Sequence, residues 1–243
     1  MISLRHFSFG YDPHRLLFED VNMDFEAGKL TALIGRNGCG KSTLLRSIAC
    51  LTGNYTGQIL IDGIDSRGMT ASELARYISF VDTSRIRVPN LKCIDLVALG
   101  RSPYTDWTGR LNENDRKIVW DALAMVGMEA FSERSVDRIS DGECQRVMIA
   151  RALAQQTPVI LLDEPTSFID LPGRYDLCAL LRSLTADYGK TIVFSTHELD
   201  LACANADWIV HVSKDDNGRP VITQLPAQQV SAGSYIKDDF KSF

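Results

Sequence analysis

A glycine-rich segment that ends in a lysine and a serine carries the strongest chemical signal in this chain. Residues 35–42 read Gly-Arg-Asn-Gly-Cys-Gly-Lys-Ser, which fits the pattern G-x-x-x-x-G-K-[ST] throughout. Glycines let a backbone wrap closely around phosphate oxygens and present N–H groups to them. A lysine in this position reaches the β- and γ-phosphates, and the serine hydroxyl coordinates Mg²⁺. The segment therefore predicts a nucleoside triphosphate site, with Lys41 on the phosphates and Ser42 on the metal.

The flanking residues supply the context that this pattern needs. An apolar strand is expected at 30–34 and a helix at 41–51, whose N-terminus adds a partial positive charge beside a phosphate. A chance glycine-rich turn is the alternative, and it does not explain the strand, the helix and the Lys-Ser pair together. The residues expected to bind the nucleotide are Gly35, Arg36, Asn37, Gly38, Cys39, Gly40, Lys41, Ser42 and Thr43.

Two carboxylates follow a short apolar run farther along the chain. Val-Ile-Leu-Leu at 159–162 leads directly into Asp163 and Glu164. Ligands of open parallel sheets bind at the carboxyl ends of the strands, so we expect both acids to face the nucleotide. Asp163 is expected to hold the Mg²⁺ shell, and Glu164 to orient and polarise the attacking water as a general base. A solvated strand end before Pro165 is the alternative, and the glycine-rich loop favours the catalytic interpretation.

The composition is that of an ordinary globular protein. The 243 residues are 45% hydrophobic and 23% charged, with a net charge of −5 at pH 7, which disfavours a nucleic-acid partner. No run approaches the roughly 20 apolar residues of a membrane span, and residues 1–6 lack the pattern of a secretory signal. We therefore expect a cytoplasmic protein, and docking on a membrane protein stays open.

Six cysteines are scattered without Cys-x-x-Cys spacing, which favours free thiols over a zinc site. Cys39 differs from the others because it lies inside the glycine-rich loop at an expected helix N-terminus, a position that favours the thiolate. We hypothesise that Cys39 is alkylated readily and that bound ATP protects it. The alternative is a small residue that merely fills space.

Strand-like and helix-like segments alternate along most of the chain. Strands are expected at 3–9, 21–25, 30–34, 58–61, 78–81, 159–162, 191–194 and 208–212. Unbroken apolar strands between helices predict an α/β fold with a mostly parallel sheet covered on both faces. The stretch 89–137 is helical in pattern, with Asn112 as a cap, and interrupts this alternation. We expect one domain with a core at 1–85 and 138–230, an inserted helical subdomain at 86–137, and a polar, poorly ordered tail at 231–243.

In this order the segments resemble the ATP-binding cassette (ABC) family over nearly the whole chain. Tyr11 resembles the aromatic residue that stacks on adenine. Ile-Ser-Asp-Gly-Glu at 139–143 resembles the family's signature Leu-Ser-Gly-Gly-Gln. Ser-Phe-Ile-Asp at 167–170 resembles the loop that crosses the dimer interface, and His197 resembles the switch histidine that contacts the γ-phosphate. Each element is weak by itself, and their order around the two strong motifs supports the family.

The resemblance implies a P-loop NTPase core with an N-terminal antiparallel β subdomain, and ATP and Mg²⁺ as ligands. It implies an ATPase in which Glu164, His197 and Lys41 are catalytic. It also implies a head-to-tail homodimer, in which Ser140 and Gly142 of one subunit hold the ATP bound by the other. Binding of ATP would close this dimer and hydrolysis would reopen it.

Part of the expected helical insertion indicates which subfamily of the ABC family the chain resembles. Residues 95–104 and 109–111, followed by the helix with Asp115, are similar to importers of iron–siderophore complexes, haem and vitamin B12. Such a subunit would lie in the cytoplasm on the inner face of the membrane, bound to permease subunits and served indirectly by a periplasmic or surface substrate-binding protein. A soluble ABC ATPase without a permease is the alternative. A chromosome-associated cassette would need a long heptad-rich insertion, and the sequence has none.

Two residues depart from the family pattern. Thr83 stands where the family has a glutamine that senses Mg²⁺ and water, and its shorter side chain would reach only through a water. Asp141 replaces a glycine of the signature. A carboxylate there would repel the partner's γ-phosphate, or it would turn away and cap the next helix.

Overall fold

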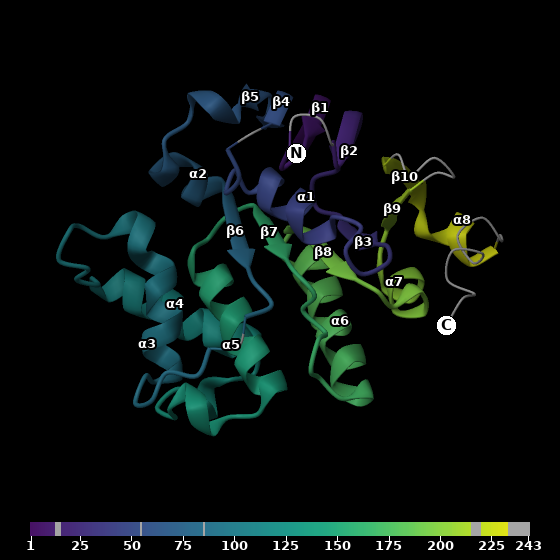
Figure 1. The fold of residues 1–243 in the computed structure, drawn as a ribbon. Helices are drawn as coiled ribbons and strands as arrows, with labels where there is room; N and C mark the ends of the chain where they lie inside the picture. The colour runs from purple at the N-terminus through teal and green to yellow at the C-terminus, as the bar shows by residue number, and fades with distance from the viewer. Residues whose placement is uncertain (13–15, 54, 85, 215–219, 233–243) are drawn as a thin grey trace.

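Two β-sheets and their covering helices make up the fold (Figure 1). The computed structural model describes residues 1–12, 16–53, 55–84, 86–214 and 220–232. The first sheet is antiparallel, in the order β2-β1-β4-β5. Its strands are β1 (Ile2–Phe9), β2 (Phe18–Phe25), β4 (Tyr55–Ile61) and β5 (Ile64–Asp65). This sheet agrees with the antiparallel β subdomain that the family resemblance implies.

The second sheet has six strands in the order β10-β9-β3-β8-β7-β6. They are β3 (Leu30–Ile34), β6 (Ile78–Val81), β7 (Val159–Leu162), β8 (Thr191–Thr196), β9 (Trp208–Lys214) and β10 (Pro220–Pro226). The five strands from β9 to β6 are parallel, and β10 pairs antiparallel with β9. All residues of β3, β7 and β8 are buried, as expected for parallel strands covered on both faces.

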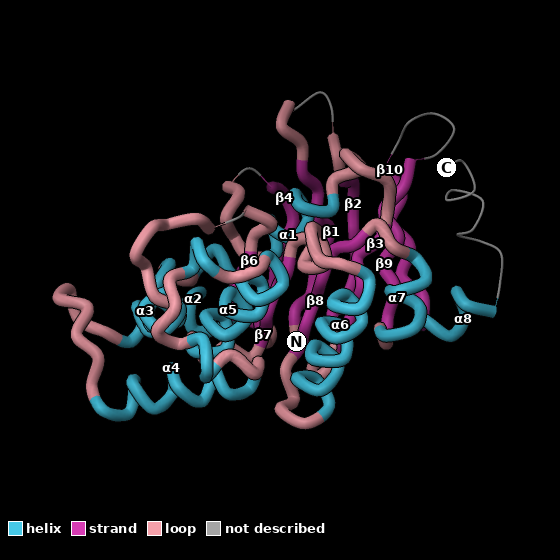
Figure 2. Tube along the Cα trace, turned by 90° about the horizontal axis from the view of Figure 1, so that it is seen from below, coloured by secondary structure: helices cyan, strands magenta, loops and turns pink. Residues whose placement is uncertain are grey.

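Side chains of β3 alternate between two hydrophobic cores. Leu30, Ala32 and Ile34 pack into a core with helices of the chain's middle and C-terminal parts, including α5 and α6, while Leu33 packs with the antiparallel sheet and α1. The helices are α1 (Lys41–Ile48), α2 (Ala71–Tyr77), α3 (Cys93–Ala98), α4 (Glu113–Met125), α5 (Asp141–Ala154), α6 (Leu171–Ala186), α7 (Leu199–Asn205) and α8 (Ala227–Ala232). Figure 2 shows α5, α6 and α7 together against the strands. The parallel sheet is therefore the middle layer.

Between β6 and α5 the described chain is mostly helical, as expected. It contains α3, α4 and three 3₁₀ helices, η2 (Leu99–Tyr104), η3 (Glu129–Phe131) and η4 (Val136–Arg138). Asn112 caps α4 and forms a capping box with Asp115, so the predicted cap is confirmed. No helix in the described ranges is long and apolar enough to cross a membrane.

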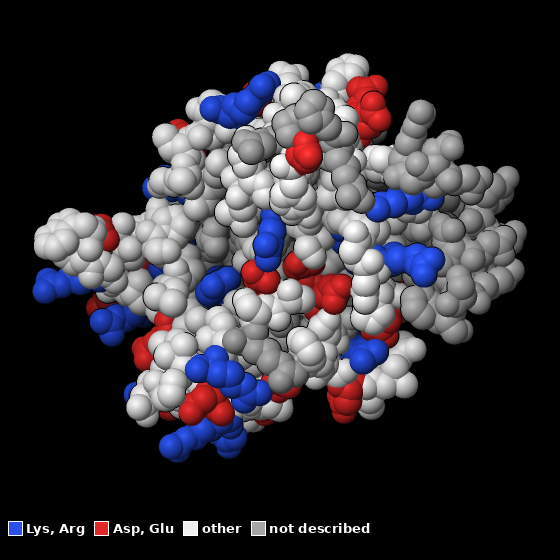
Figure 3. Space-filling view, viewed as in Figure 1, with Lys and Arg blue, Asp and Glu red and all other residues white. Residues whose placement is uncertain are grey.

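The expected strands are confirmed, with differences at their ends. The first helix ends at Ile48 and not at residue 51. The sequence interpretation missed β5, β10, α8 and the short helix η1 (Ser66–Gly68). The predicted tail from residue 233 onward lies outside the described residues. On the face drawn in Figure 3, acidic and basic side chains are interspersed, which is usual for a protein surface.

Candidate active site

The glycine-rich segment forms the turn from β3 into α1. Its last glycine, Gly40, is the N-cap of α1 with φ of 111°, a conformation that favours glycine, and it has no side chain to cap the helix. Lys41 is only 4% exposed, and its Nζ donates to the carbonyl oxygens of Gly35 at 2.9 Å and Arg36 at 3.3 Å. The ammonium group of Lys41 is therefore held inside the glycine-rich loop, where it can bind an anion.

The side chain of Asp163 forms hydrogen bonds with residues of helix α1 and strand β8. Asp163 is only 2% exposed, and its Oδ1 accepts hydrogen bonds from Ser42 Oγ at 2.9 Å and from Ser195 Oγ at 2.7 Å. Ser195 lies near the end of β8, which pairs with β7 on one side and β3 on the other. Two strand ends and the first turn of α1 therefore meet at one carboxylate.

Glu164 follows Asp163 with a positive φ of 44°, which directs its side chain differently from the strand before it. Its backbone N–H donates to Ser195 Oγ at 2.7 Å. Its Oε2 accepts from Ser167 Oγ at 3.0 Å. The carboxylate is therefore anchored through one oxygen, at the mouth of the site.

A hollow of about 620 Å³ joins these groups. Its lining residues are Tyr11, Asp12, Leu16, Leu17, Asn37, Gly38, Gly40, Lys41, Ser42, Thr43, Glu164, Lys214 and Pro220. The ring of Tyr11 is 78% exposed, lies edge-on to Phe9 at 5.1 Å, and its hydroxyl is 2.9 Å from Thr43 Oγ1. The structure therefore brings together Tyr11, most of the glycine-rich loop and Glu164. Adenine stacking on Tyr11 stays a prediction.

Several predicted site residues lie elsewhere. His197 is exposed directly after β8 and is not among the residues that line this hollow. Arg36 and Cys39 line an adjoining hollow of about 290 Å³, together with His211 and Lys214. Ser140 and Gly142 are also outside the main hollow, at the start of α5.

The predicted thiolate at Cys39 is wrong in direction. Burial raises the pKa of the Cys39 thiol above its ordinary value, and the opposing effect of the Lys41 charge is smaller. The thiol is therefore protonated at neutral pH, and ready alkylation is not expected.

The first residues of α5 test the interpretation that Asp141 caps this helix. Ser140 is the N-cap, and it forms a capping box in which Glu143 N donates to Ser140 Oγ at 3.2 Å and Ser140 N donates to Glu143 Oε2 at 2.7 Å. Asp141 is the first helical residue and accepts from Arg87 Nη2 at 2.6 Å. The cap interpretation of Asp141 is therefore wrong, and Arg87 sets a positive charge beside this carboxylate.

The oxygen atoms around Asp163 suit Mg²⁺. The ion prefers hard oxygen ligands and is usually held by one or two carboxylates together with substrate phosphates. Ser42 and Asp163 already lie within hydrogen-bond distance of each other. Among the described residues, no group of three or more His, Cys, Asp or Glu side chains is placed to hold a metal ion.

Three residues near this site escaped the sequence interpretation: Ser195, Arg87 and Gln145. Ser195 follows an expected strand at 191–194, and a hydroxyl at that strand end is a signal that was available. Arg87 gave no such signal, because its ion pair with Asp141 joins segments far apart in the sequence. Gln145 gave none either, because the burial of its amide nitrogen depends on the folded chain.

A phosphate-binding turn between a parallel strand and a helix, with an acidic strand end two strands away, defines a P-loop nucleotide-binding protein. A model of the ABC transporter family matches residues 18–167. The chain therefore belongs to the ABC transporter family.

Characterised relatives cover most of the chain. The achromobactin transport ATP-binding protein of Dickeya dadantii is 39% identical over 87% of this chain and 78% of its own length. The iron(3+)-hydroxamate import ATP-binding protein of Bacillus subtilis is 33% identical over 99% of this chain and 87% of its own length. A dimeric ATP-binding cassette in a post-hydrolysis state, bound to ADP and Pi, superposes with a TM-score of 0.78 at 28% identity, covering 94% of this chain and all of that one.

Proposed function

We propose that this chain is the ATP-hydrolysing subunit of an ABC importer that takes up an iron complex, a ferric siderophore in particular, through a membrane permease. The observation that carries the ATPase part is the meeting of Lys41, Ser42 and Glu164 around one hollow, with Asp163 bonded to Ser42. The importer part and the cargo rest on the two relatives described above. Haem and vitamin B12 remain further cargoes of the same class.

In the proposed reaction the N–H groups of the glycine-rich loop and Lys41 bind the β- and γ-phosphates of ATP. Lys41 exchanges its carbonyl partners for phosphate oxygens, which are better acceptors for an ammonium group. Ser42 and Asp163 would hold Mg²⁺, which would supply positive charge beside the phosphates. Tyr11 covers the adenine from the open side of the hollow.

Glu164 accepts a proton from a water molecule while the water oxygen bonds to the γ-phosphorus. The bond between the γ-phosphorus and the bridging oxygen breaks, and ADP leaves with that oxygen. Ser167 and Ser195 orient Glu164 through its carboxylate and its backbone N–H, respectively. His197 contacts the γ-phosphate after the dimer closes, since it lies outside the hollow of the single chain.

The working unit we propose is a head-to-tail homodimer. Ser140 and Gly142 face the ATP of the other subunit, where the N-terminus of α5 offers N–H groups and a favourable dipole to the γ-phosphate. The dimer lies on the cytoplasmic face of the membrane against the permease. Residues 86–137 form its helical subdomain. A soluble ABC ATPase without a permease remains the second candidate, and co-purification with a multi-helix permease separates the two.

The change Glu164→Gln tests the catalytic assignment, because the amide keeps the shape of the side chain and cannot take the proton. We expect a loss of about 10²- to 10⁴-fold in the rate of phosphate release, and an ATP-bound dimer that accumulates on size-exclusion chromatography. The matched control is Glu113→Gln, at the start of α4 and away from the hollow. Hydrolysis by Glu164→Gln at the parent rate would refute the assignment.

A further inference from the structure

The side-chain amide nitrogen of Gln145, in helix α5, lacks a hydrogen-bond partner among the described residues. This atom, Nε2, is fully buried. A buried donor without an acceptor is costly, and native proteins tolerate it mainly where water, an ion or a function supplies the partner. Gln145 therefore needs an acceptor at this place.

The acceptor has room in a small hollow that Gln145 lines. This hollow of about 20 Å³ lies between the chain after β6, the first turns of α5 and the chain after β7. A polar site of about 10–15 Å³ is enough to hold one water molecule. Thr83, Gln145 and Glu164 are all among its lining residues, so the residue with the unpaired amide borders the same small space as the proposed general base.

Thr83 and Glu164 have oxygen atoms that can accept hydrogen bonds from such a water. Thr83 Oγ1 donates its proton to Asp82 Oδ1 at 3.2 Å, which leaves the Thr83 oxygen as an acceptor. Ser167 donates to Oε2 of Glu164, and the carboxylate retains acceptor sites on its other oxygen. The residues around this hollow therefore offer a water one unpaired donor, Gln145 Nε2, and acceptor oxygens on Thr83 and Glu164.

We infer that Gln145 is a positioning residue for ATP hydrolysis, which holds a water between α5 and Glu164 and so supplies the amide that Thr83 does not. The inference rests on the proposed function of Glu164. The water orients the carboxylate toward the attacking water of the reaction, and it links the start of α5 to the site through Gln145. Because Thr83 and Gln145 border the same space, a glutamine at either position can perform this role.

Three variants test the inference by steady-state phosphate release and by equilibrium binding of fluorescent ATP: Gln145→Ala, Gln145→Met and the double variant Gln145→Ala/Thr83→Gln. The methionine keeps the volume of the glutamine and removes the orphan donor, so its stability is at least that of the parent. We expect kcat to fall about 10- to 100-fold in both single variants. ATP affinity is expected to change less than about twofold, since binding uses the glycine-rich loop. The double variant is expected to regain most of the lost kcat.

Gln58→Ala, an exposed glutamine of β4, is the matched control and keeps the parent kcat. Parent-like kcat in Gln145→Met would overturn the inference, because the amide would then serve no purpose in hydrolysis. A loss that Thr83→Gln leaves unrescued would also overturn it. Failure of the proposed function has a different signature: the parent itself would release no phosphate, or Glu164→Gln would release it at the parent rate.

Discussion

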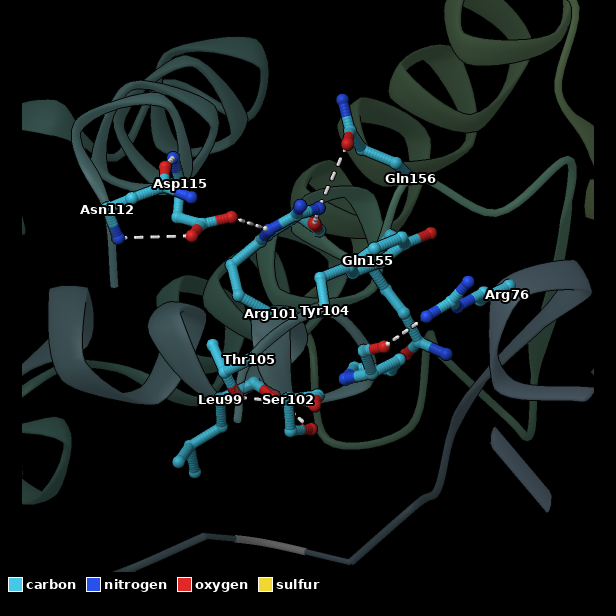
Figure 4. A network of polar contacts seen from close by, with 12 residues as sticks. Arg76, Leu99, Arg101, Ser102, Tyr104, Thr105, Asn112, Asp115, Gln155 and Gln156 are labelled. Carbon is cyan, nitrogen blue, oxygen red and sulfur yellow. Dashed lines mark hydrogen bonds and ion pairs between the residues drawn. The ribbon is translucent and has the colours of Figure 1, made fainter. Parts of the chain in front are cut away.

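The buried ion pair between Arg101 and Asp115 gives a prediction whose size follows from the structure. Both side chains are 5% exposed, and Arg101 Nε donates to Asp115 Oδ1 at 2.9 Å (Figure 4). Asp115 also accepts from the backbone N–H of Asn112 at 3.1 Å, as the second half of the capping box of α4. The change Asp115→Ala removes both interactions and leaves the guanidinium buried.

Breaking a buried pair by removing one partner typically costs about 3–5 kcal/mol. The damaged cap adds about 1 kcal/mol. Arg101 keeps part of its surroundings, since it donates to Ala154 O at 2.8 Å and Gln156 Oε1 at 2.9 Å and lies over the ring of Tyr104. We therefore expect a total loss of about 3–4 kcal/mol in the free energy of unfolding, which lowers Tm by about 10 °C in a chain of this size.

Urea unfolding followed by circular dichroism measures this loss, with calorimetry for Tm. Asp121→Ala is the control, because Asp121 is exposed on the same helix and its removal should cost less than about 0.5 kcal/mol. The double variant Arg101→Met/Asp115→Leu removes the orphaned charge and is expected to recover much of the stability. A loss below about 1 kcal/mol in Asp115→Ala would show that water reaches the pair, and our reasoning on its burial would be wrong.

Two further predictions concern the site. Since burial raises the pKa of Cys39, its labelling by iodoacetamide at pH 7 should be slower than that of free cysteine, and should rise only above the free-thiol pKa of about 8.5; equal rates at pH 7 would contradict this. Arg87→Ala should weaken ATP-driven dimerisation of the Glu164→Gln variant by up to about fivefold, because the half-exposed pair with Asp141 is worth about 1 kcal/mol or less. Adding Asp141→Gly should reverse the effect in analytical ultracentrifugation, and no change in either variant would remove Asp141 from the interface.

Local sequence order was sufficient to place the strands and the helix that carry the candidate site. The strand before Gly35, the helix after Gly40 and the acids after β7 are each specified by a few neighbouring residues, so their pattern predicts their place. The short strand β5 and the late strand β10 were missed. β5 has two residues, and β10 begins at a proline and alternates partly exposed positions without a strong apolar face.

Charge and burial effects were predicted less well. The helix N-terminus at Cys39 argued for a thiolate, yet burial of the sulfur has the larger effect on its pKa. Asp141 suggested a cap, but Ser140 stands one residue earlier with Glu143 at the spacing of a capping box, and this pair takes the position. Arg87 meets Asp141 across 54 positions of sequence, a proximity that only the folded chain creates.

The position of β8 in the sheet sets the distance between the glycine-rich loop and the two acids after β7. Neighbouring strands are about 4.8 Å apart. Because β8 lies between β3 and β7, the ends of β3 and β7 are roughly 10 Å apart. In the proposed reaction, that distance would leave room for a γ-phosphoryl group and one water between the loop and Glu164. If β7 paired directly with β3, the Glu164 carboxylate would lie closer to the glycine-rich loop, and charge repulsion would oppose nucleotide entry. Strand β8 thus has two effects on the site: Ser195 bonds to Asp163 and Glu164, and the width of the strand separates Glu164 from the glycine-rich loop.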